Sequence, residues 1–224
     1  MKLDKDQIRM VIALFVVAAV AAILLGLTDL VTREPIAAAQ KAALHQALQQ
    51  VLPAHSNDPQ ADKIHVGSVG GSVAGADMDK ADSGVVMYPA RDASGLLQGL
   101  AWEVIAPDGY SGSVRILVGV RPDGRVFAIR ITQHQETPGL GDGVVKNTGW
   151  LASFVDQNLG SKNWKVKKDG GDFDQFTGAT ITPRAVVKAV KGALVFFTAQ
   201  KKAIFARLRA QAQQRDKTGM VNGG

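Results

Sequence analysis

The strongest constraint on the fold is a long uncharged segment close to the N-terminus. Residues 10–27 contain no charged side chain, and only Gly26 weakens their tendency to form a helix. At 1.5 Å per residue, such a helix nearly crosses a hydrocarbon core of about 30 Å. Extending it to residue 31 completes the span, with Asp29 at the interface. The sequence therefore predicts one transmembrane helix over residues 10–31.

A cleaved signal peptide and a buried core helix are the two alternatives to such an anchor. A signal peptide has a shorter apolar core, of about 7–15 residues, followed by a cleavage site with small residues. Residues 37–39 are all alanine, but they lie well beyond the apolar run. A core helix is rarely apolar on every face. We therefore favour an uncleaved anchor.

The basic residues around the span set its expected orientation. More of them precede the span than follow it closely: Lys2, Lys5 and Arg9 against Arg33 and Lys41. This bias favours an N-terminus inside the cell, although Asp4 and Asp6 offset it in part. In a bacterium, this predicts an inner-membrane protein with residues 1–9 in the cytoplasm and the main domain in the periplasm.

Length and composition leave room for one domain after the anchor. The chain has 224 residues, of which 46% are hydrophobic and 21% charged, so it is neither disordered nor wholly membrane-embedded. It has no cysteine, which excludes disulfides, thiolate nucleophiles and iron–sulfur clusters held by its own cysteines. The formal net charge is +6, but the basic residues are scattered and few aromatic residues separate them. We therefore expect no nucleic-acid partner.

Residues 32–60 are expected to lead from the membrane to the domain. Within them, residues 36–51 place apolar side chains at helical spacing, with Pro35 suited to a first turn and Pro53 to a stop. This pattern predicts a separate linker helix. Residues 67–84 are rich in Gly, Ala, Ser and Asp and indicate a loop or poorly ordered insert, to which we assign no role.

Residues 61–214 are predicted to form a single α+β domain with an antiparallel sheet and flanking helices. Strand-like runs occupy residues 85–88, 97–105, 114–120 and 126–132, and the sequence RPDG at 121–124 indicates a hairpin between the last two. The remaining elements are a short helix at 150–158, a short strand at 164–166 and a long helix from 183 to about 214. Residues 215–224 are left as a tail.

The segment most relevant to chemistry is DGGDFDQFTGATITPR, residues 169–184. Thr182 is a good N-cap and Pro183 a good first residue for the long helix. A phosphate attached to Thr180 would lie near unpaired backbone N–H groups and the positive end of the helix dipole. Gly178 and Ala179 leave the backbone there uncrowded. Spacing alone also allows a plain capped helix after a tight turn, and the segment lacks the Gly-Lys-Ser/Thr ending of a P-loop.

A family resemblance favours the phosphate interpretation. The pattern D-x-x-T-G-A-T, formed by Asp174, Thr177, Gly178, Ala179 and Thr180, resembles the covalent flavinylation motif in the FMN-binding subunits of Rnf and Nqr complexes. The resemblance implies that FMN is joined to Thr180 through a phosphoester. It also implies a separate flavin transferase that uses FAD as donor with a divalent metal and recognises Asp174.

Two further loops carry the same resemblance, so that it covers nearly the whole chain. PDGYSG at 107–112 resembles the family's GYxG loop, and HQETPGLG at 134–141 its ETPGLG loop, while WKVKK at 164–168 precedes the flavin motif as the family requires. The G subunits of Rnf complexes are the most similar group. The resemblance implies flavin contacts from Tyr110, Glu136, Thr137, Gly139, Leu140, Gly141 and Lys167. Without it, both loops are ordinary turns and Lys167 is equally well a solvated surface lysine.

Other patterns in the sequence give weaker indications. His134 and Glu136 lie two residues apart, without the His-Glu-x-x-His spacing of a helical zinc site. The aspartates at 169, 172 and 174 lack the spacing and the terminal glutamate of a calcium loop. We therefore expect no metal site. Lys201, Lys202, Arg207 and Arg209 indicate a solvated helix face, with contact to anionic lipid headgroups as an alternative.

The expected function follows from the resemblance. It implies an electron-transfer subunit that relays electrons between other subunits of a membrane complex, with the flavin supplying the redox chemistry and the chain not catalytic alone. No dinucleotide-binding fingerprint is present, so we expect no NAD site. The alternative is a membrane-anchored scaffold or sensory module that binds partners without redox turnover. A free-standing reductase is less favoured because no substrate domain remains.

Overall fold

The computed structural model describes residues 5–67, 84–139 and 141–221, with the side chains at 7, 8 and 215–221 left out. Most of the predicted insert at 67–84 and the predicted flavin contact Leu140 therefore lie outside the described residues. The chain divides into two compact units, Met1–His45 and Gln46–Gly224, which are described separately below.

The first unit consists of most of helix α1, which runs from Lys5 to Val51. The helix is continuous, so the predicted break before a separate linker helix is absent, and Pro35 lies inside it. Alanines at 37–39 favour helix on the far side of that proline, which offsets the one hydrogen bond that it removes. Residues 52–60 follow the helix as turns.

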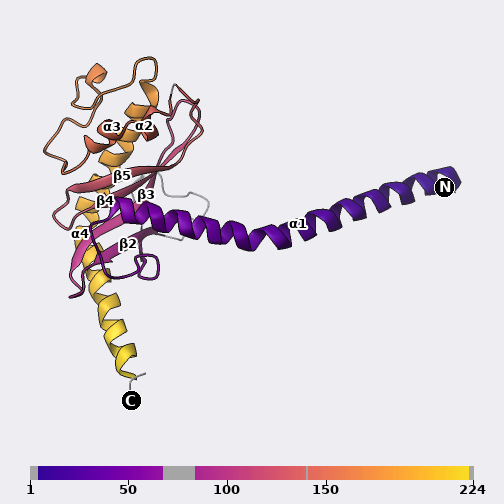
Figure 1. The fold of residues 1–224 in the computed structure, drawn as a ribbon, viewed down its shortest axis with the longest axis horizontal. Coiled ribbons are helices and arrows are strands. Elements are labelled where there is room, and N and C mark those ends of the chain that lie inside the picture. The colour runs from indigo at the N-terminus through magenta and orange to yellow at the C-terminus, as the bar shows by residue number, and fades with distance from the viewer. Residues whose placement is uncertain (1–4, 68–83, 140, 222–224) are drawn as a thin grey trace. The chain divides into compact units, whose positions relative to one another are not determined.

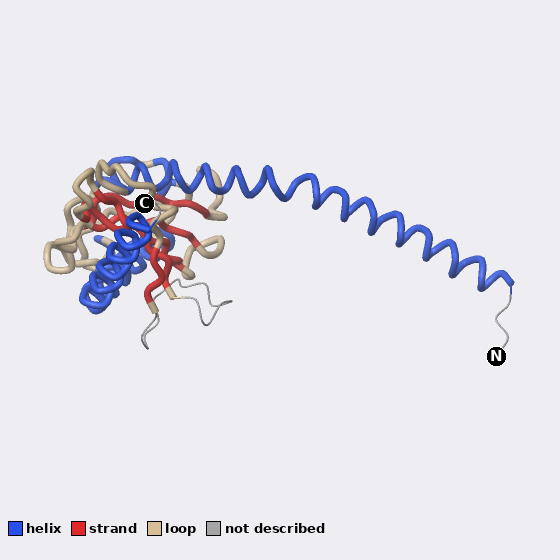
Figure 2. Tube along the Cα trace, turned by 90° about the horizontal axis from the view of Figure 1, so that it is seen from below, coloured by secondary structure: helices blue, strands red, loops and turns tan. Residues whose placement is uncertain are grey.

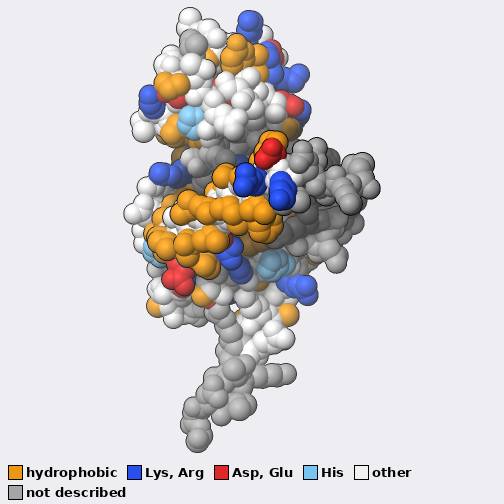
Figure 3. Space-filling model, turned by 90° about the vertical axis from the view of Figure 1, so that its right-hand side faces the viewer, with side chains coloured by type: hydrophobic (Ala, Val, Ile, Leu, Met, Phe, Trp, Pro, Cys, Tyr) orange, Lys and Arg blue, Asp and Glu red, His pale blue; other side chains and the backbone are white. Residues whose placement is uncertain are grey.

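The apolar part of α1 is uncovered. The most hydrophobic 18-residue window of this helix has a mean hydropathy of 3.0 and is 0% buried. Among the described residues, α1 is the one helix long and apolar enough to cross a membrane. Figure 3 shows exposed hydrophobic side chains gathered in a band, and α1 supplies most of the large ones. The hydroxyls of Thr28 and Thr32 donate to backbone carbonyls four residues earlier, at 2.8 and 2.7 Å. Both polar groups are thereby satisfied within the helix.

The second unit is built on a five-stranded antiparallel sheet with the order β1-β2-β3-β4-β5 (Figure 1). Its strands are β1 (Ile64–Val66), β2 (Val85–Arg91), β3 (Leu97–Ala106), β4 (Val114–Val120) and β5 (Val126–Gln133). The predicted α+β class and the four predicted strands are confirmed. β1 was not predicted, because three residues are too few to establish an alternating pattern.

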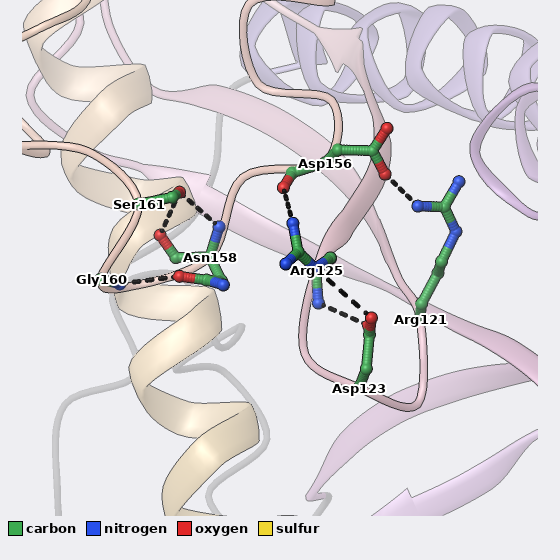
Figure 4. Close-up of polar contacts among 7 residues, drawn as sticks. All are labelled: Arg121, Asp123, Arg125, Asp156, Asn158, Gly160 and Ser161. Carbon is green, nitrogen blue, oxygen red and sulfur yellow. Dashed lines mark hydrogen bonds and ion pairs between the residues drawn. The ribbon is translucent and has the colours of Figure 1, made fainter.

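The predicted hairpin between β4 and β5 is present, and it is hydrogen-bonded to the loop at residues 153–161 (Figure 4). Gly124 closes its turn with a φ of +95° and donates from its N–H to the Arg121 carbonyl at 2.9 Å. Arg121 forms an ion pair with Asp156, and the Arg125 guanidinium donates to the Asp156 carbonyl at 3.1 Å. The backbone of Asp156 in turn donates to Val126 at 2.8 Å. These contacts fix the start of β5 against residues 153–161.

The helices of this unit are α2 (Gly143–Lys146), α3 (Thr148–Ala152), the 3₁₀ turn η1 (Lys167–Asp169) and α4 (Ile181–Val221). The predicted helix at 150–158 is therefore shorter and starts earlier. The predicted strand at 164–166 is wrong: Val166 forms only an isolated bridge with Phe173, since η1 follows at once. α4 continues through the region predicted as a tail as far as Val221.

The sheet is the middle layer of this unit (Figure 2). On one face, Trp102 of β3 stacks on Phe197 of α4, with ring centroids 6.1 Å apart. On the other face, Ala101 and Gly119 are paired across β3 and β4, and a Cβ added at Gly119 would overlap the Val51 carbonyl. The backbone at the end of α1 therefore rests directly on β4, and Val51 and Gly119 must approach closely for the two to pack.

Candidate functional site

The segment before α4 forms a tight turn. The Ala179 N–H donates to the Phe176 carbonyl at 3.0 Å, and these two residues form an antiparallel bridge. Gly178 has a φ of +79°, the value that a type II turn requires at its third residue. Thr177 and Gly178 are exposed and Thr180 is half-buried. The turn thus leads the chain directly from Phe176 to the threonine at the start of the helix.

Thr180 is the residue immediately before α4. Its carbonyl accepts the first helical hydrogen bond, from the Arg184 N–H at 3.2 Å. The prediction that Thr182 caps the helix and that Pro183 is its first residue is therefore wrong by two positions. Proline still fits, because the N–H groups of a first helical turn have no partner within the helix.

Thr182 instead joins α4 to the loop at 107–112. Its side chain is 1% exposed, and its hydroxyl oxygen accepts from the Tyr110 N–H at 3.3 Å. The Tyr110 ring itself is 70% exposed. At this point the loop thus contacts the helix through the Tyr110 backbone and not through its ring, which the sequence could not indicate.

Glu136 joins the loop at 107–112 to the loop at 134–141. It is 5% exposed, and its Oε1 accepts from the Ser111 N–H at 3.2 Å. Its Oε2 has no hydrogen-bond partner among the described residues. A Cβ at Gly109 would lie 3.0 Å from Oε1, and one at Gly141 would overlap Oε2. Glycine in both loops therefore makes room for this carboxylate.

The loop at 137–142 is closed by its own hydrogen bonds. The Gly141 N–H donates to the Thr137 carbonyl at 3.2 Å, and the Gly139 N–H donates to Asp142 Oδ1 at 2.9 Å. The Lys146 ammonium lies 2.5 Å from Asp142 Oδ2. This contact, followed by the Gly139 bond, holds the pKa of Asp142 below its ordinary value, although burial opposes it. Asp142 was not predicted, yet it directly follows the glycine-rich motif.

Aromatic residues connect α2 and α3 with the segment before Thr180. The Trp150 indole N–H donates to the Asp174 carbonyl at 2.8 Å, and the Trp150 and Phe176 ring centroids lie 5.5 Å apart. A Cβ added at Gly143 would lie 3.1 Å from the Phe176 ring. Phe176 is thus packed between α2, α3 and the turn. Trp150 and Phe176 belong to no motif, so sequence reasoning missed them.

Two ion pairs lie beside this segment. Lys167 Nζ is 2.5 Å from Asp174 Oδ1, and both side chains are more than half exposed, so the pair adds little stability. Arg184 makes two hydrogen bonds to Asp169. Lys167, predicted as a flavin contact, therefore pairs with the carboxylate of Asp174.

The structure thus brings the three predicted segments together at the start of α4. Thr180 immediately precedes the first turn of α4, where N–H groups have no partner within the helix and the helix dipole is positive, a setting that suits a phosphate. Within residues 5–67, 84–139 and 141–221, no group of three or more His, Cys, Asp and Glu residues is placed to hold a metal ion.

Comparison with known families defines the class of protein. Residues 109–195, which include the start of α4 and the two loops, match the family model of the FMN-binding domain. Residues 1–51 match the model of the RnfG N-terminal region. The chain is therefore an FMN-binding domain that follows an N-terminal helix.

Individual relatives identify the family. The chain is 45% identical over 192 residues to the G subunit of the ion-translocating oxidoreductase complex of Aliivibrio fischeri, covering 84% of this chain and 88% of that protein. It is 44% identical over 202 residues to the G subunit of the same complex in Shewanella amazonensis, covering 87% of each. The chain belongs to this family of G subunits. Among solved structures it is similar to NqrC of Shewanella oneidensis, with 21% identity and a TM-score of 0.46 over 68% of this chain and 74% of that chain.

Proposed function

We propose that this chain is the electron-transfer subunit of a membrane-bound ion-translocating oxidoreductase and carries FMN covalently through a phosphoester on Thr180. The observation that carries the proposal is the position of the Thr180 hydroxyl, directly before a long helix and directly after a glycine-dependent turn. Family membership supports the redox role, since the relatives are named as subunits of such complexes.

The residues around Thr180 fit an FMN. Its phosphate group would face the N–H groups of Ile181 and Thr182, which have no acceptor within the helix. A Cβ at Gly139 or Gly178 would meet nothing within 4 Å, so both loops leave backbone open to a planar ring. Among the described residues, Glu136 Oε2 is a buried acceptor without a donor, which a polar edge of a ligand would satisfy.

The proposed attachment uses one group of this chain. The Thr180 hydroxyl loses its proton, and its oxygen forms a bond to phosphorus. With FAD as donor, the phosphoanhydride bond breaks and AMP leaves, so that the atoms balance without an oxidant. A separate flavin transferase would supply the base and the divalent metal. Asp174 and Thr177 would form part of the sequence that this enzyme reads.

The remaining residues position the group. When bound, the flavin supplies one- and two-electron chemistry. Glu136, through Ser111, holds the loop at 107–112 in place, and Thr182 holds the same loop on α4. We further propose that α1 anchors the chain in the bacterial inner membrane, with the N-terminus cytoplasmic and the second unit periplasmic. Other subunits of the complex would exchange electrons with this chain, and lipid would surround α1.

Intact mass of the membrane-extracted protein from its native host tests this proposal. We expect the wild type to exceed its sequence mass by one FMN less one water. Thr180→Ala should lose the whole increment, whereas Thr180→Ser, which keeps the hydroxyl, should retain part of it. Thr148→Ala, at an exposed position outside the three predicted segments, is the matched control and should stay modified. An unmodified wild type in cells that modify a control flavoprotein would instead favour a scaffold that binds partners without redox turnover.

A further inference from the structure

A basic hollow of about 410 Å³ lies beside the first three turns of α4. Its lining residues are Trp164, Lys165, Asp169, Arg184, Lys188 and Lys191. Three of them, at positions 184, 188 and 191, follow the i, i+4, i+7 spacing of one helix face. Four of the lining side chains are thus cationic and one is anionic, so the hollow carries a positive field.

Two of the four cations are neutralised within the domain and two are not. Arg184 is hydrogen-bonded to Asp169, and Lys188 forms an ion pair with Asp108 at 2.7 Å. Lys165 and Lys191 have no ion-pair partner among the described residues. The field reaches Asp169, whose pKa is lowered first by Arg184 and further by Lys165 and Lys168. A carboxylate that pairs with either of these two cations would therefore come from outside this part of the chain.

The hollow is joined to the elements that hold Thr180. Arg184 lies one turn along α4, and its N–H bonds the Thr180 carbonyl. Asp108, the partner of Lys188, belongs to the same loop as Tyr110, whose N–H bonds Thr182. Whatever binds in the hollow is therefore placed beside the start of α4.

The exposure of the lysines indicates the kind of partner. Lys165 and Lys191 are exposed, and a single ion pair at such a site contributes only about 0–1 kcal/mol. A lone small anion would gain little. A segment with several carboxylates pairs with both unpaired cations at once, and is steered toward them as it approaches. Membership of a family of complex subunits supplies protein partners.

We propose that this hollow docks an acidic segment of another subunit of the complex. Its carboxylates pair with Lys165 and Lys191, just as Asp169 and Asp108 pair with Arg184 and Lys188. This docking needs no flavin on Thr180, so it stands or falls separately from the proposed attachment. It places the partner next to the residue proposed to carry the redox group.

A water-soluble carbodiimide tests the contact in the assembled, detergent-solubilised complex, because it joins a lysine to a carboxylate only where the two touch. We expect Lys165 or Lys191 in an amide with an aspartate or glutamate of another subunit, with a lower yield when salt is raised first. The product should be lost in the double variant Lys165→Glu, Lys191→Glu. The matched control is the double variant Lys201→Glu, Lys202→Glu. It changes the net charge by the same amount, nearer the C-terminus of α4, and should keep the product.

Amine acetylation of the wild type gives a second measurement that needs no variant. Docking predicts that Lys165 and Lys191 are protected in the complex and reactive in the separated subunit. Equal reactivity in both would overturn the proposal. Protection of the separated subunit by phosphatidylglycerol vesicles would assign the surface to lipid, and protection by millimolar inorganic phosphate would assign it to a small anion. Either result would also overturn docking of an acidic segment.

Discussion

The guanidinium of Arg184 donates two hydrogen bonds to the carboxylate of Asp169, from Nε at 2.5 Å and from Nη2 at 2.8 Å. Such a two-bond pair fixes the relative orientation of its partners more strictly than a single contact does. Here it ties the first turn of α4 to η1. The segment that carries the Thr180 motif is thereby held at both ends, at residue 169 and at residue 184.

This pair gives a pH-dependent contribution to stability. Arg184 holds the pKa of Asp169 below its ordinary value, so the pair stabilises the fold above about pH 4, the pKa of an unfolded aspartate. The contribution is lost as pH falls through the lowered folded pKa. We expect Arg184→Gln to lower the Tm by a constant amount from neutral pH to about pH 4, with the difference shrinking below that. Lys191→Gln, on the same helix face, should show no such trend. A difference that grows on acidification would contradict this explanation.

The contact between β4 and the end of α1 predicts that position 119 does not tolerate a residue larger than glycine. Gly119→Ala would press a methyl group into the Val51 carbonyl, and we expect it to lower the free energy of unfolding by about 3 kcal/mol. Gly192→Ala is the matched control. It meets nothing within 4 Å and lies inside α4, so it should raise stability by about 0.5–1 kcal/mol. Urea unfolding followed by tryptophan fluorescence measures both, and equal effects would refute the packing argument.

Two glycine variants can separate the effect of the turn before Thr180 on flavin attachment from its effect on stability. Gly178 and Gly170 have φ values of +79° and +78°, and a Cβ at either meets nothing within 4 Å. Alanine at each should therefore cost a similar amount, about 1–2 kcal/mol. Only Gly178 lies in the turn that leads to Thr180, so Gly178→Ala should also reduce flavin attachment measured by intact mass. An equal loss of flavin in Gly170→Ala would show that strain alone accounts for it.

The hydrogen bond between Tyr110 and Thr182 predicts a loss of stability when its acceptor is removed. Thr182→Val keeps the shape of the side chain but removes the acceptor of the Tyr110 N–H. We expect a loss of about 0.5–1.5 kcal/mol in the free energy of unfolding, because a part-buried hydrogen bond is lost. Thr177→Val, at an exposed position, should change stability by less than about 0.5 kcal/mol. Thermal unfolding of the full chain in detergent compares the two.

The strands and the hairpin could be predicted because they depend on local pattern. Alternating apolar residues and the turn at 121–124 define them without distant contacts. The start of α4 could not be predicted in the same way. Thr180 and Thr182 are both suitable caps. In the structure the Thr182 hydroxyl accepts a hydrogen bond from the Tyr110 N–H, 72 residues away, and Thr180 is left to precede the helix.

Other parts of the site were missed for related reasons. Asp142 and Trp150 act through single hydrogen bonds to Gly139 and Asp174 that only the folded chain brings about. The continuity of α1 through Pro35 was missed because a proline is compatible both with a helix start and, at some cost, with a helix interior. A sequence pattern alone does not decide between these two.

If Thr180 carries the proposed flavin, the bond between Tyr110 and Thr182 also implies an order of events during biosynthesis. The motif from Asp174 to Thr180 is contiguous and is complete as soon as it leaves the ribosome. Its setting is not, because the loop that contacts Thr182 connects β3 to β4, and Glu136, after β5, holds that same loop through Ser111. An enzyme that requires the hydroxyl in this setting acts only after the sheet has assembled. The modification would then occur only on chains that have folded. A chain whose sheet failed to form would reach its complex without a cofactor.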